Sequence, residues 1–596
     1  MTKNDTKNIT ACNECFEIKL SLDSGLKVEG IMCGGVSWLP TVCELFELYM
    51  RNTSYPASAM QVRDVFFFTD STQEMVSILL EQEPGIEVRV CLLLNSDQSV
   101  NILAQLALQF DDCPEEIYLH VPLLSALRTE ATFTRTFPGK PAAKADGSSV
   151  VIAHPEIRLP FCLFEEDTGN GICVDFPAIN EGLIKAWDMN RNHDFLAIAS
   201  FAELESHRFL LRPNNVFSTI FELNLTAVKN GWKDCFELAR QKARINLSEE
   251  EYNREDLKWY QDTLLHHFSF LYGYETYNYE KGQVDLESLL KQGEEFGGYN
   301  ALLLWNQYPR LGVDSRNQWD FFAAFPDGIN GLRKLVDLAH AKGIRVFLPY
   351  KPWDIGVTES AESVQEKVST LIRDTDIDGI FFDTMDSAPE GLREAIDRVK
   401  PGVVFCTESK PKTFRTLKLI TGSWDKYSSP VPMPEINLLR FVVPEHFSPI
   451  NARWHVGMKK DLLIKRAVFN GTGIVIWQDI FGAWLPYSQK QKQEIRKWKQ
   501  IFTKNKNILF CKKPVPLYPT LHEGLLCNYF PADDGKACIL TLYNDSLTDF
   551  DSALLSRNGF YFESATELWN GSNIIMKNDK IYGKIAAGDI AVIKMN

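Results

Sequence analysis

The chain of 596 residues lacks several features that would assign it to a class at once. No apolar stretch reaches the length of about 20 residues that a membrane-spanning helix needs, so we expect no membrane partner. Lys and Arg do not cluster and the net charge is -15, which argues against the basic surface of a nucleic-acid binder. The first twenty residues contain no apolar segment typical of a secretory signal peptide, so we expect a cytoplasmic protein.

Cysteine frameworks and common catalytic motifs are also missing. The 13 cysteines have no regular spacing and their number is odd, which favours reduced thiols over a disulfide framework. Cys12 and Cys15 form an isolated C-x-x-C that no second pair completes, so we expect no metal and no cofactor. The absence of H-E-x-x-H, G-x-S-x-G and P-loop motifs argues against the usual zinc protease, serine hydrolase and nucleotide-binding sites.

Length and hydrophobic patterning predict a multidomain protein, α/β plus all-β, because one core cannot serve a chain of this size. Residues 1–245 contain runs of alternating polarity, such as 16–22 and 87–94, that predict an N-terminal β-sandwich followed by a helical connector. Residues 246–504 alternate apolar strands with helices, which is typical of a (β/α)₈ TIM barrel. In residues 505–596 the alternating runs return, and we expect a small C-terminal β-sandwich.

Eight apolar segments form the expected barrel strands, mostly with helical crossovers between them. A doubly wound sheet is the alternative, but no G-x-G-x-x-G follows an early strand. The expected strands are Phe268–Tyr272, Ala301–Trp305, Arg345–Tyr350, Gly379–Asp383, Val403–Thr407, Leu419–Trp424, Leu438–Val443 and Ile474–Trp477. The expected helices between them are Leu286–Phe296, Gly331–Lys342, Ser360–Asp374 and Glu390–Lys400.

Two consecutive expected strands end in a carboxylate. The fourth ends in Asp383 and the fifth runs directly into Glu408. Parallel strands of a barrel present their C-terminal residues at one face, where barrel enzymes carry their active sites. A pair of carboxylates across a cleft is the minimal equipment for cleaving a glycosidic bond. We therefore predict Asp383 and Glu408 as the catalytic pair.

Polar and aromatic residues follow most of the other strand ends. A tryptophan ring offers a flat apolar surface that suits the C–H face of a sugar, and polar groups beside it suit hydroxyls. Trp353 and Trp477 are the expected stacking platforms. The competing interpretations are that these rings plug the barrel mouth, that Asp314 pairs with Arg310, and that Asp386 caps the next helix. The predicted substrate-binding residues are Trp305, Asn306, Arg310, Asp314, Lys351, Trp353, Asp354, Asp386, Trp424, Asp425, Glu445, His446, Trp477, Asp479 and Trp484.

The predicted order of β-sandwich, barrel and β-domain resembles the architecture of large retaining α-glycosidases. An acid at the end of strand four is shared with the α-galactosidase clan. An acid there with a Glu on strand five resembles endo-α-N-acetylgalactosaminidases and the α-amylase group more closely. The resemblance implies that Asp383 is the nucleophile and Glu408 the general acid/base. The chain departs from the Lys-x-Asp triplet of the α-galactosidase clan, because it has Phe381-Phe382-Asp383.

We therefore expect a glycoside hydrolase that cleaves an α-glycosidic bond of an oligosaccharide or glycoconjugate with retention, its partner being a carbohydrate substrate. One alternative is an inverting glycosidase that pairs Asp383 with Asp425 or Glu445 and leaves room for a water between the carboxylates. Another is a carbohydrate-binding protein without catalysis. The sugar, its linkage, transglycosylation in place of hydrolysis, and a homo-oligomeric state stay open.

Overall fold

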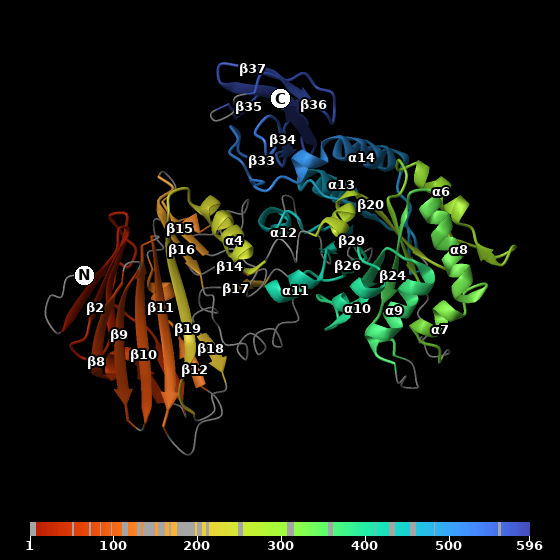
Figure 1. Ribbon diagram of the computed structural model, residues 1–596. Coiled ribbons are helices and arrows are strands. Elements are labelled where there is room, and N and C mark those ends of the chain that lie inside the picture. Colours follow the sequence, from red (N-terminus) through yellow and green to blue (C-terminus); the bar gives the residue numbers. More distant parts are fainter. Residues whose placement is uncertain are drawn as a thin grey trace. The chain divides into compact units, whose positions relative to one another are not determined.

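The computed structural model divides into two compact units, Met1–Lys242 and Ala243–Asn596 (Figure 1). Within the described residues, no helix is both long and apolar enough to span a bilayer. The structure describes residues 7–50, 53–70, 73–83, 85–96, 98–109, 117–127, 133–134, 150–152, 161–165, 168–175, 197–199, 206–209, 214–247, 254–306, 315–355, 362–411, 413–427, 436–452, 460–481, 483–557 and 562–596.

The first unit is built of antiparallel sheets. Its strands are β1 (Asn8–Cys12), β2 (Phe16–Ser21), β3 (Lys27–Cys33), β4 (Val36–Ser37), β5 (Cys43–Glu44), β6 (Glu47–Met50), β7 (Thr53–Pro56), β8 (Gln61–Thr69), β9 (Gln73–Gln82), β10 (Ile86–Asn95), β11 (Ser99–Leu108), β12 (Ile117–His120), β13 (Phe133–Thr134), β14 (Val150–Ile152), β15 (Phe161–Phe164), β16 (Gly171–Asp175), β17 (Ala197–Ala199), β18 (Ser206–Phe209) and β19 (Asn214–Val228). The described helices are a 3-10 helix (Ala57–Ala59), α1 (Leu123–Ala126) and α4 (Trp232–Asn246), whose last four residues follow the unit boundary in sequence.

The largest sheet of this unit has eight strands in the order β13-β15-β16-β19-β11-β10-β9-β8. Along β10 the side chains of Ile86, Val88 and Val90 are buried while Glu87 and Arg89 between them are partly exposed. This period of two places one face of the strand in the core. Buried residues of the β1–β5 sheet, of β6 and of β9–β11 belong to the same core cluster, so the sheets pack face to face. The predicted N-terminal β-sandwich is confirmed.

The second unit begins with the barrel. Its strands are β20 (Leu265–Phe270), β23 (Ala301–Trp305), β24 (Arg345–Tyr350), β25 (Gly379–Phe382), β26 (Val404–Thr407), β27 (Gly422–Ser423), β28 (Asp425–Tyr427), β29 (Ile450–Ala452) and β30 (Ile474–Ile476). Its helices are a 3-10 helix (Glu255–Asp262), α6 (Leu286–Glu294), α7 (Gln318–Ala323), α8 (Gly328–Ala341), α9 (Val364–Thr375), α10 (Leu392–Val399), α11 (Phe414–Leu419), α12 (Leu438–Val442), α13 (Lys460–Phe469) and α14 (Gln489–Leu509). Two short hairpins, β21 (Tyr277–Asn278) with β22 (Gln283–Val284) and β31 (Asp479–Ile480) with β32 (Ala483–Trp484), follow β20 and β30.

The parallel sheet closes on itself. Its order is β27-β26-β25-β24-β23-β20-β30-β29-β28, and only Trp424 separates the two end strands in sequence. The Trp424 amide donates to Thr407 O on β26, whereas the Asp425 amide donates to Pro449 O just before β29. β27 and β28 are therefore two halves of one sixth strand, and nine segments make an eight-stranded barrel with α6, α8, α9 and α10 around it (Figure 1).

The expected strands overlap the barrel strands except for the seventh. The sixth, expected at Leu419–Trp424, begins in helix α11 (Phe414–Leu419) and shares only Gly422 and Ser423 with β27. Residues 438–443 are not a strand, because Leu438–Val442 forms helix α12, whose N-cap Asn437 accepts a hydrogen bond from the Arg440 amide. A short apolar run does not distinguish a buried strand from a buried helix, which explains the error. The seventh strand is β29, so Glu445 and His446 precede it instead of following a strand end.

The chain ends in two antiparallel sheets of orders β33-β34-β39-β36 and β35-β38-β37. Side chains from both sheets form one core, as the predicted C-terminal β-sandwich requires. Helix α14 continues across residues 504 and 505, where the sequence predicts the boundary between the barrel and the C-terminal domain. The position of that boundary stays a prediction. The strands are β33 (Leu525–Pro531), β34 (Cys538–Asn544), β35 (Phe550–Ser556), β36 (Ala565–Glu567), β37 (Ile575–Lys577), β38 (Lys580–Ile585) and β39 (Ile590–Met595).

Candidate active site

Alternation along the barrel strands directs both predicted carboxylates into the barrel mouth. On β25, the Phe381 ring contacts the Trp424 ring inside the barrel with centroids 4.2 Å apart. On β26, Cys406 accepts a hydrogen bond from the Tyr260 hydroxyl at 3.2 Å. Asp383 and Glu408 each lie two residues further on, and residues two apart on a strand share a face. Both carboxyl groups therefore project inward at the C-terminal ends of their strands.

The two carboxyl groups are close enough to share a hydrogen bond. Burial first, and then the charge of Glu408, raise the pKa of Asp383 to about 7. Trp353 Nε1 donates to Asp383 Oδ2 at 3.1 Å, and the Thr384 amide donates to Glu408 Oε2 at 2.8 Å. Because two adjacent carboxylates resist ionising together, the pair keeps one proton up to about pH 7.

Thr384, which the sequence interpretation did not consider, has a strained backbone. Its φ is 59°, the left-handed region that a β-branched residue rarely adopts. In this conformation its amide reaches Glu408, and its hydroxyl donates to Asp383 O at 2.7 Å. Strain of this kind persists where the surrounding contacts hold it, and it is frequent at functional sites. Its position between the two carboxylates in sequence is the only signal that could have pointed to it.

Lys351 places a cation beside the pair. The side chain is fully buried, and its Nζ donates to Asn306 O at 3.2 Å and lies 5.8 Å from the centre of the Trp353 ring. Burial lowers its pKa to about 8, while the charges of Asp354 and Asp383 oppose that effect. The amine is therefore still protonated at neutral pH and attracts negative charge on Asp383.

Gln318, also missed from the sequence, holds the loop after β24. Its side-chain oxygen accepts from the Lys351 amide at 2.8 Å, and its side-chain nitrogen donates to Lys351 O at 2.6 Å and to Asp354 O at 3.1 Å. Asn306 Nδ2 donates to the backbone oxygen of Gln318 at 3.2 Å. The first residue of α7 thus connects the ends of the second and third barrel strands. It positions Lys351 and the segment that carries Trp353.

The predicted tryptophans divide into two groups. Trp305, Trp424 and Trp477 are only 2%, 4% and 7% exposed, and their rings lie 5.1, 6.1 and 4.3 Å from that of Phe268. These three rings fill the barrel beneath the carboxylates and form its floor. Trp353 is 40% exposed and hydrogen-bonded to Asp383, so its ring can face a ligand.

The hairpin after β30 forms another part of the rim. Trp484 on β32 is 49% exposed and pairs with Asp479 on β31. The backbone oxygen of Asp479 accepts from Trp477 Nε1 at 2.9 Å, which joins the hairpin to the barrel floor. Both residues follow the eighth strand, as the sequence predicts.

Three other predicted residues have hydrogen-bond or ion-pair partners outside the pair. Asp425 is buried in an ion pair with Lys410 Nζ at 2.5 Å. His446 is buried, and its Nε2 shares a hydrogen bond with the Ser423 hydroxyl. The backbone oxygen of Glu445 accepts a hydrogen bond from the side chain of Gln261, a residue that precedes β20. Glu445 therefore lies at the N-terminal end of the barrel strands, opposite the carboxylates.

The remaining predicted residues are Asp386, Asp354, Arg310 and Asp314. Asp386 is not the N-cap of the following helix, since Gly391 has that position. Asp354, which follows Trp353 in sequence, is fully buried, and its charge opposes the fall in the pKa of Lys351 that burial causes. Arg310 and Asp314 lie outside the described residues.

Several solved structures resemble the whole chain. The GH36 α-galactosidase AgaB from Geobacillus stearothermophilus has a TM-score of 0.54 and 12% identity, covering 100% of this chain and 99% of its own. A variant of the α-galactosidase AgaA from the same organism, in complex with 1-deoxygalactonojirimycin, has a TM-score of 0.52 and 11% identity, covering 99% and 100%. The α-N-acetylgalactosaminidase NagBb from Bifidobacterium bifidum, in complex with GalNAc, has a TM-score of 0.53 and 10% identity, covering 89% and 98%. No protein-family model and no curated protein matches the chain. At such identity the likeness concerns the fold.

Proposed function

We propose that this protein is a retaining glycoside hydrolase that cleaves an α-glycosidic bond, with Asp383 as nucleophile and Glu408 as general acid/base. One observation carries the proposal: two carboxyl groups from neighbouring parallel strands lie close enough at the C-terminal mouth of a barrel for Glu408 to raise the pKa of Asp383. Retention requires carboxyl groups about 5 Å apart, whereas inversion requires a wider gap for a water. The closeness of this pair supports retention.

The reaction takes two steps. Asp383 attacks the anomeric carbon and forms an ester with the sugar, while the bond to the leaving oxygen breaks and Glu408 gives that oxygen its proton. Water then enters the leaving group's place. Glu408 removes a proton from this water as it attacks the anomeric carbon, and the ester bond to Asp383 breaks. The sugar leaves with its original configuration and both carboxyl groups return to their starting state.

The charges around the pair favour this division of roles. The pair holds one proton up to about pH 7, and the first step needs that proton on Glu408. Lys351 attracts negative charge to Asp383, and the Trp353 N–H group stabilises the carboxylate by a hydrogen bond. A glycosidic oxygen bound beside Glu408 accepts a hydrogen bond only from the protonated acid, so substrate binding favours the same arrangement.

The surroundings of the pair support a sugar as substrate. Exposed Trp353 offers a stacking surface, and partly exposed Asp479 on the rim hairpin supplies a polar group for hydroxyls. Three of the structural neighbours are named as α-galactosidases or an α-N-acetylgalactosaminidase. We therefore place aryl α-galactosides and aryl α-N-acetylgalactosaminides first in a substrate panel, followed by other aryl α- and β-glycosides.

Trapping of the intermediate tests the proposal. The chain is incubated with an activated fluoro-sugar matching its best substrate, and the labelled peptide is identified by mass spectrometry. We expect the sugar on Asp383, no label in Asp383→Asn, and turnover of that variant reduced on the order of 10⁴-fold or more. Asp337→Asn is the matched control, because Asp337 is an exposed carboxylate on α8. A label on another carboxylate would refute the assignment of Asp383.

The other two functions predict different results of the same experiment. An inverting enzyme turns over substrate without any covalent label, but its candidate bases are poorly placed, since Asp425 is ion-paired with Lys410 and Glu445 lies at the opposite barrel end. A sugar-binding protein shows neither turnover nor label across the panel. The anomeric configuration of the first product, observed by NMR, separates retention from inversion.

A further inference from the structure

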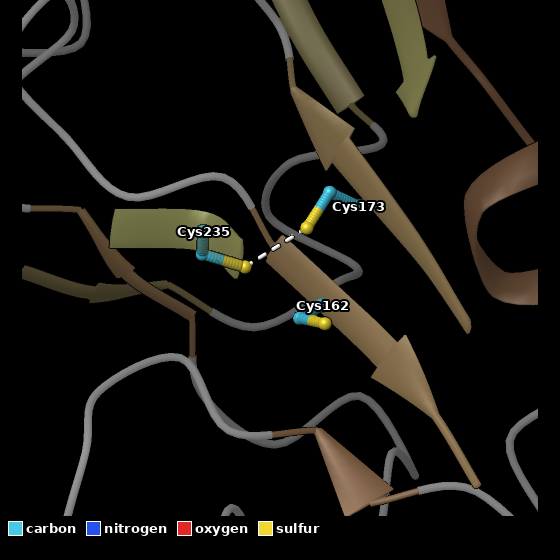
Figure 2. Close-up of side chains that lie close together, drawn as sticks. All are labelled: Cys162, Cys173 and Cys235. Atoms are coloured by element: carbon cyan, nitrogen blue, oxygen red, sulfur yellow. Dashed lines mark hydrogen bonds between the residues drawn. The ribbon is translucent and has the colours of Figure 1, made fainter. Parts of the chain in front are cut away.

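Three cysteines meet inside the first unit. Cys162 lies on β15, Cys173 on β16 and Cys235 in the first turn of α4, and their sulfur atoms all lie within 4.8 Å of one another. Figure 2 shows Cys173 and Cys235 pointing toward each other with Cys162 beside them. Each side chain is at most 1% exposed. Among the described residues this is the one group of three cysteines close enough to share an ion.

Sheet register and helix position bring the three together. β15 and β16 pair with Cys162 directly opposite Cys173, so both side chains stand on one face of the sheet. Helix α4 begins a few residues after β19, the other neighbour of β16, and contributes Cys235 over that face. Two contacts fix the helix against the hairpin. The Gly231 amide donates to Gly169 O at 2.8 Å, and Lys242 forms an ion pair with Asp175 at 3.3 Å.

We propose that Cys162, Cys173 and Cys235 bind a thiophilic metal ion, Zn²⁺ or Cu⁺, in a closed structural site that joins α4 to the β15–β16 hairpin. Thiolates are the ligands that select these two ions. Metal–sulfur bonds of about 2.3 Å separate the sulfurs by about 3.8 Å around a tetrahedral ion, which takes one further ligand, or by about 4.0 Å around a trigonal one, which the three thiolates complete. The Cys173 and Cys235 sulfurs are 2.9 Å apart and would move apart slightly. On binding, each thiol loses its proton to solvent and its sulfur forms one bond to the ion.

Burial separates this proposal from a redox function. A thiol that exchanges with a partner disulfide must be reachable by an attacking sulfur, and reactive cysteines are partly exposed. None of the three is accessible. A structural metal site is closed to solvent in this way, because its ligands hold the surrounding segments together. Cys91 is a suitable control position. It is also buried, but the neighbour of its sulfur at 3.6 Å is the Ser77 hydroxyl, so it does not belong to the cluster of three cysteines.

Metal analysis of the full chain, purified under reducing and anaerobic conditions, tests the site. Samples loaded with Zn²⁺ or with Cu⁺ are freed of excess ion and measured by mass spectrometry of the elements. We expect one ion per chain in the wild type and Cys91→Ser, and occupancy lower by roughly tenfold or more in Cys162→Ser, Cys173→Ser and Cys235→Ser. Which ion survives a competition between the two identifies the occupant.

A second measurement does not depend on the variants folding. In the wild type loaded with Co²⁺, cysteine ligation gives a thiolate-to-cobalt charge-transfer absorption, and a strong chelator should lower the melting temperature by several degrees, with recovery on adding metal. Wild-type protein that retains neither ion after loading would overturn the proposal. So would equal occupancy in the three serine variants, or a disulfide between Cys173 and Cys235 in the anaerobic sample.

Discussion

Replacing Trp353 with Phe tests the electrostatics of the carboxylate pair. The change removes the N–H group that donates to Asp383 Oδ2 at 3.1 Å and keeps an aromatic ring. A hydrogen bond to a charged group contributes about 1.5–3 kcal/mol, and the lower value applies because Trp353 is 40% exposed. Since 1.36 kcal/mol corresponds to one pH unit, the pKa of Asp383 should rise from about 7 to about 8.

The assay is the pH dependence of kcat/KM on the best substrate of the panel. Above the pKa of Asp383 both carboxyl groups are charged and the acid is lost, so that pKa sets the basic limb of the profile. In Trp353→Phe we expect the basic limb to move up by about one pH unit. We also expect the value at the optimum to fall by up to about tenfold, because less of the charge then resides on Asp383.

Trp484→Phe is the matched control, since Trp484 is a similarly exposed tryptophan on the hairpin at the rim. Its profile should keep the wild-type limbs, with an effect on KM alone where the ring contacts substrate. A basic limb of Trp353→Phe that stays in place or moves to lower pH would refute the electrostatic reasoning.

Two further predictions concern stability and positioning. The native pKa of Asp383 lies above its unfolded value of 3.8, so its ionisation costs stability as the pH rises from about 4 to about 7. Asp383→Asn should therefore be more stable than the wild type at pH 8, by about 1–3 kcal/mol, and equal to it at pH 4, in denaturant unfolding at both values. A larger gain at pH 4 would contradict this sign. Gln318→Ala leaves buried backbone groups of Lys351 and Asp354 without their partner, so kcat/KM should fall about 10–100-fold with unchanged circular dichroism. Gln489→Ala, at the exposed first residue of α14, should keep wild-type activity, and an equal loss there would argue against a positioning role for Gln318.

Much of the barrel is predictable because its strands are buried on both faces. Ala301–Trp305 and Val346–Tyr350 are continuous apolar runs between helical patterns, and the structure has the strands Ala301–Trp305 and Arg345–Tyr350 with the expected bounds. The sixth and seventh strands are short, and neither is a continuous apolar run. β29 has only three residues, Ile450–Ala452, and the apolar segment before it packs as a helix.

The roles of aromatic residues near strand ends are less predictable. Trp305 and Trp353 both follow apolar segments in sequence, yet one is buried in the barrel floor and the other is exposed beside Asp383. Strand twist and the residues on neighbouring strands decide which ring turns inward. The sequence alone left undecided which tryptophans fill the barrel, and the structure places Trp305, Trp424 and Trp477 there.

The amino-acid sequence predicts the order of the elements and the two acids that end neighbouring strands. Both depend on local periodicity and on the rule that parallel strands point the same way. The closeness of Asp383 and Glu408, the buried cation of Lys351 and the meeting of Cys162, Cys173 and Cys235 are decided by the tertiary structure alone. Electrostatic coupling and metal ligation fall off within a few ångströms, and only the folded chain brings residues from separate segments within that range.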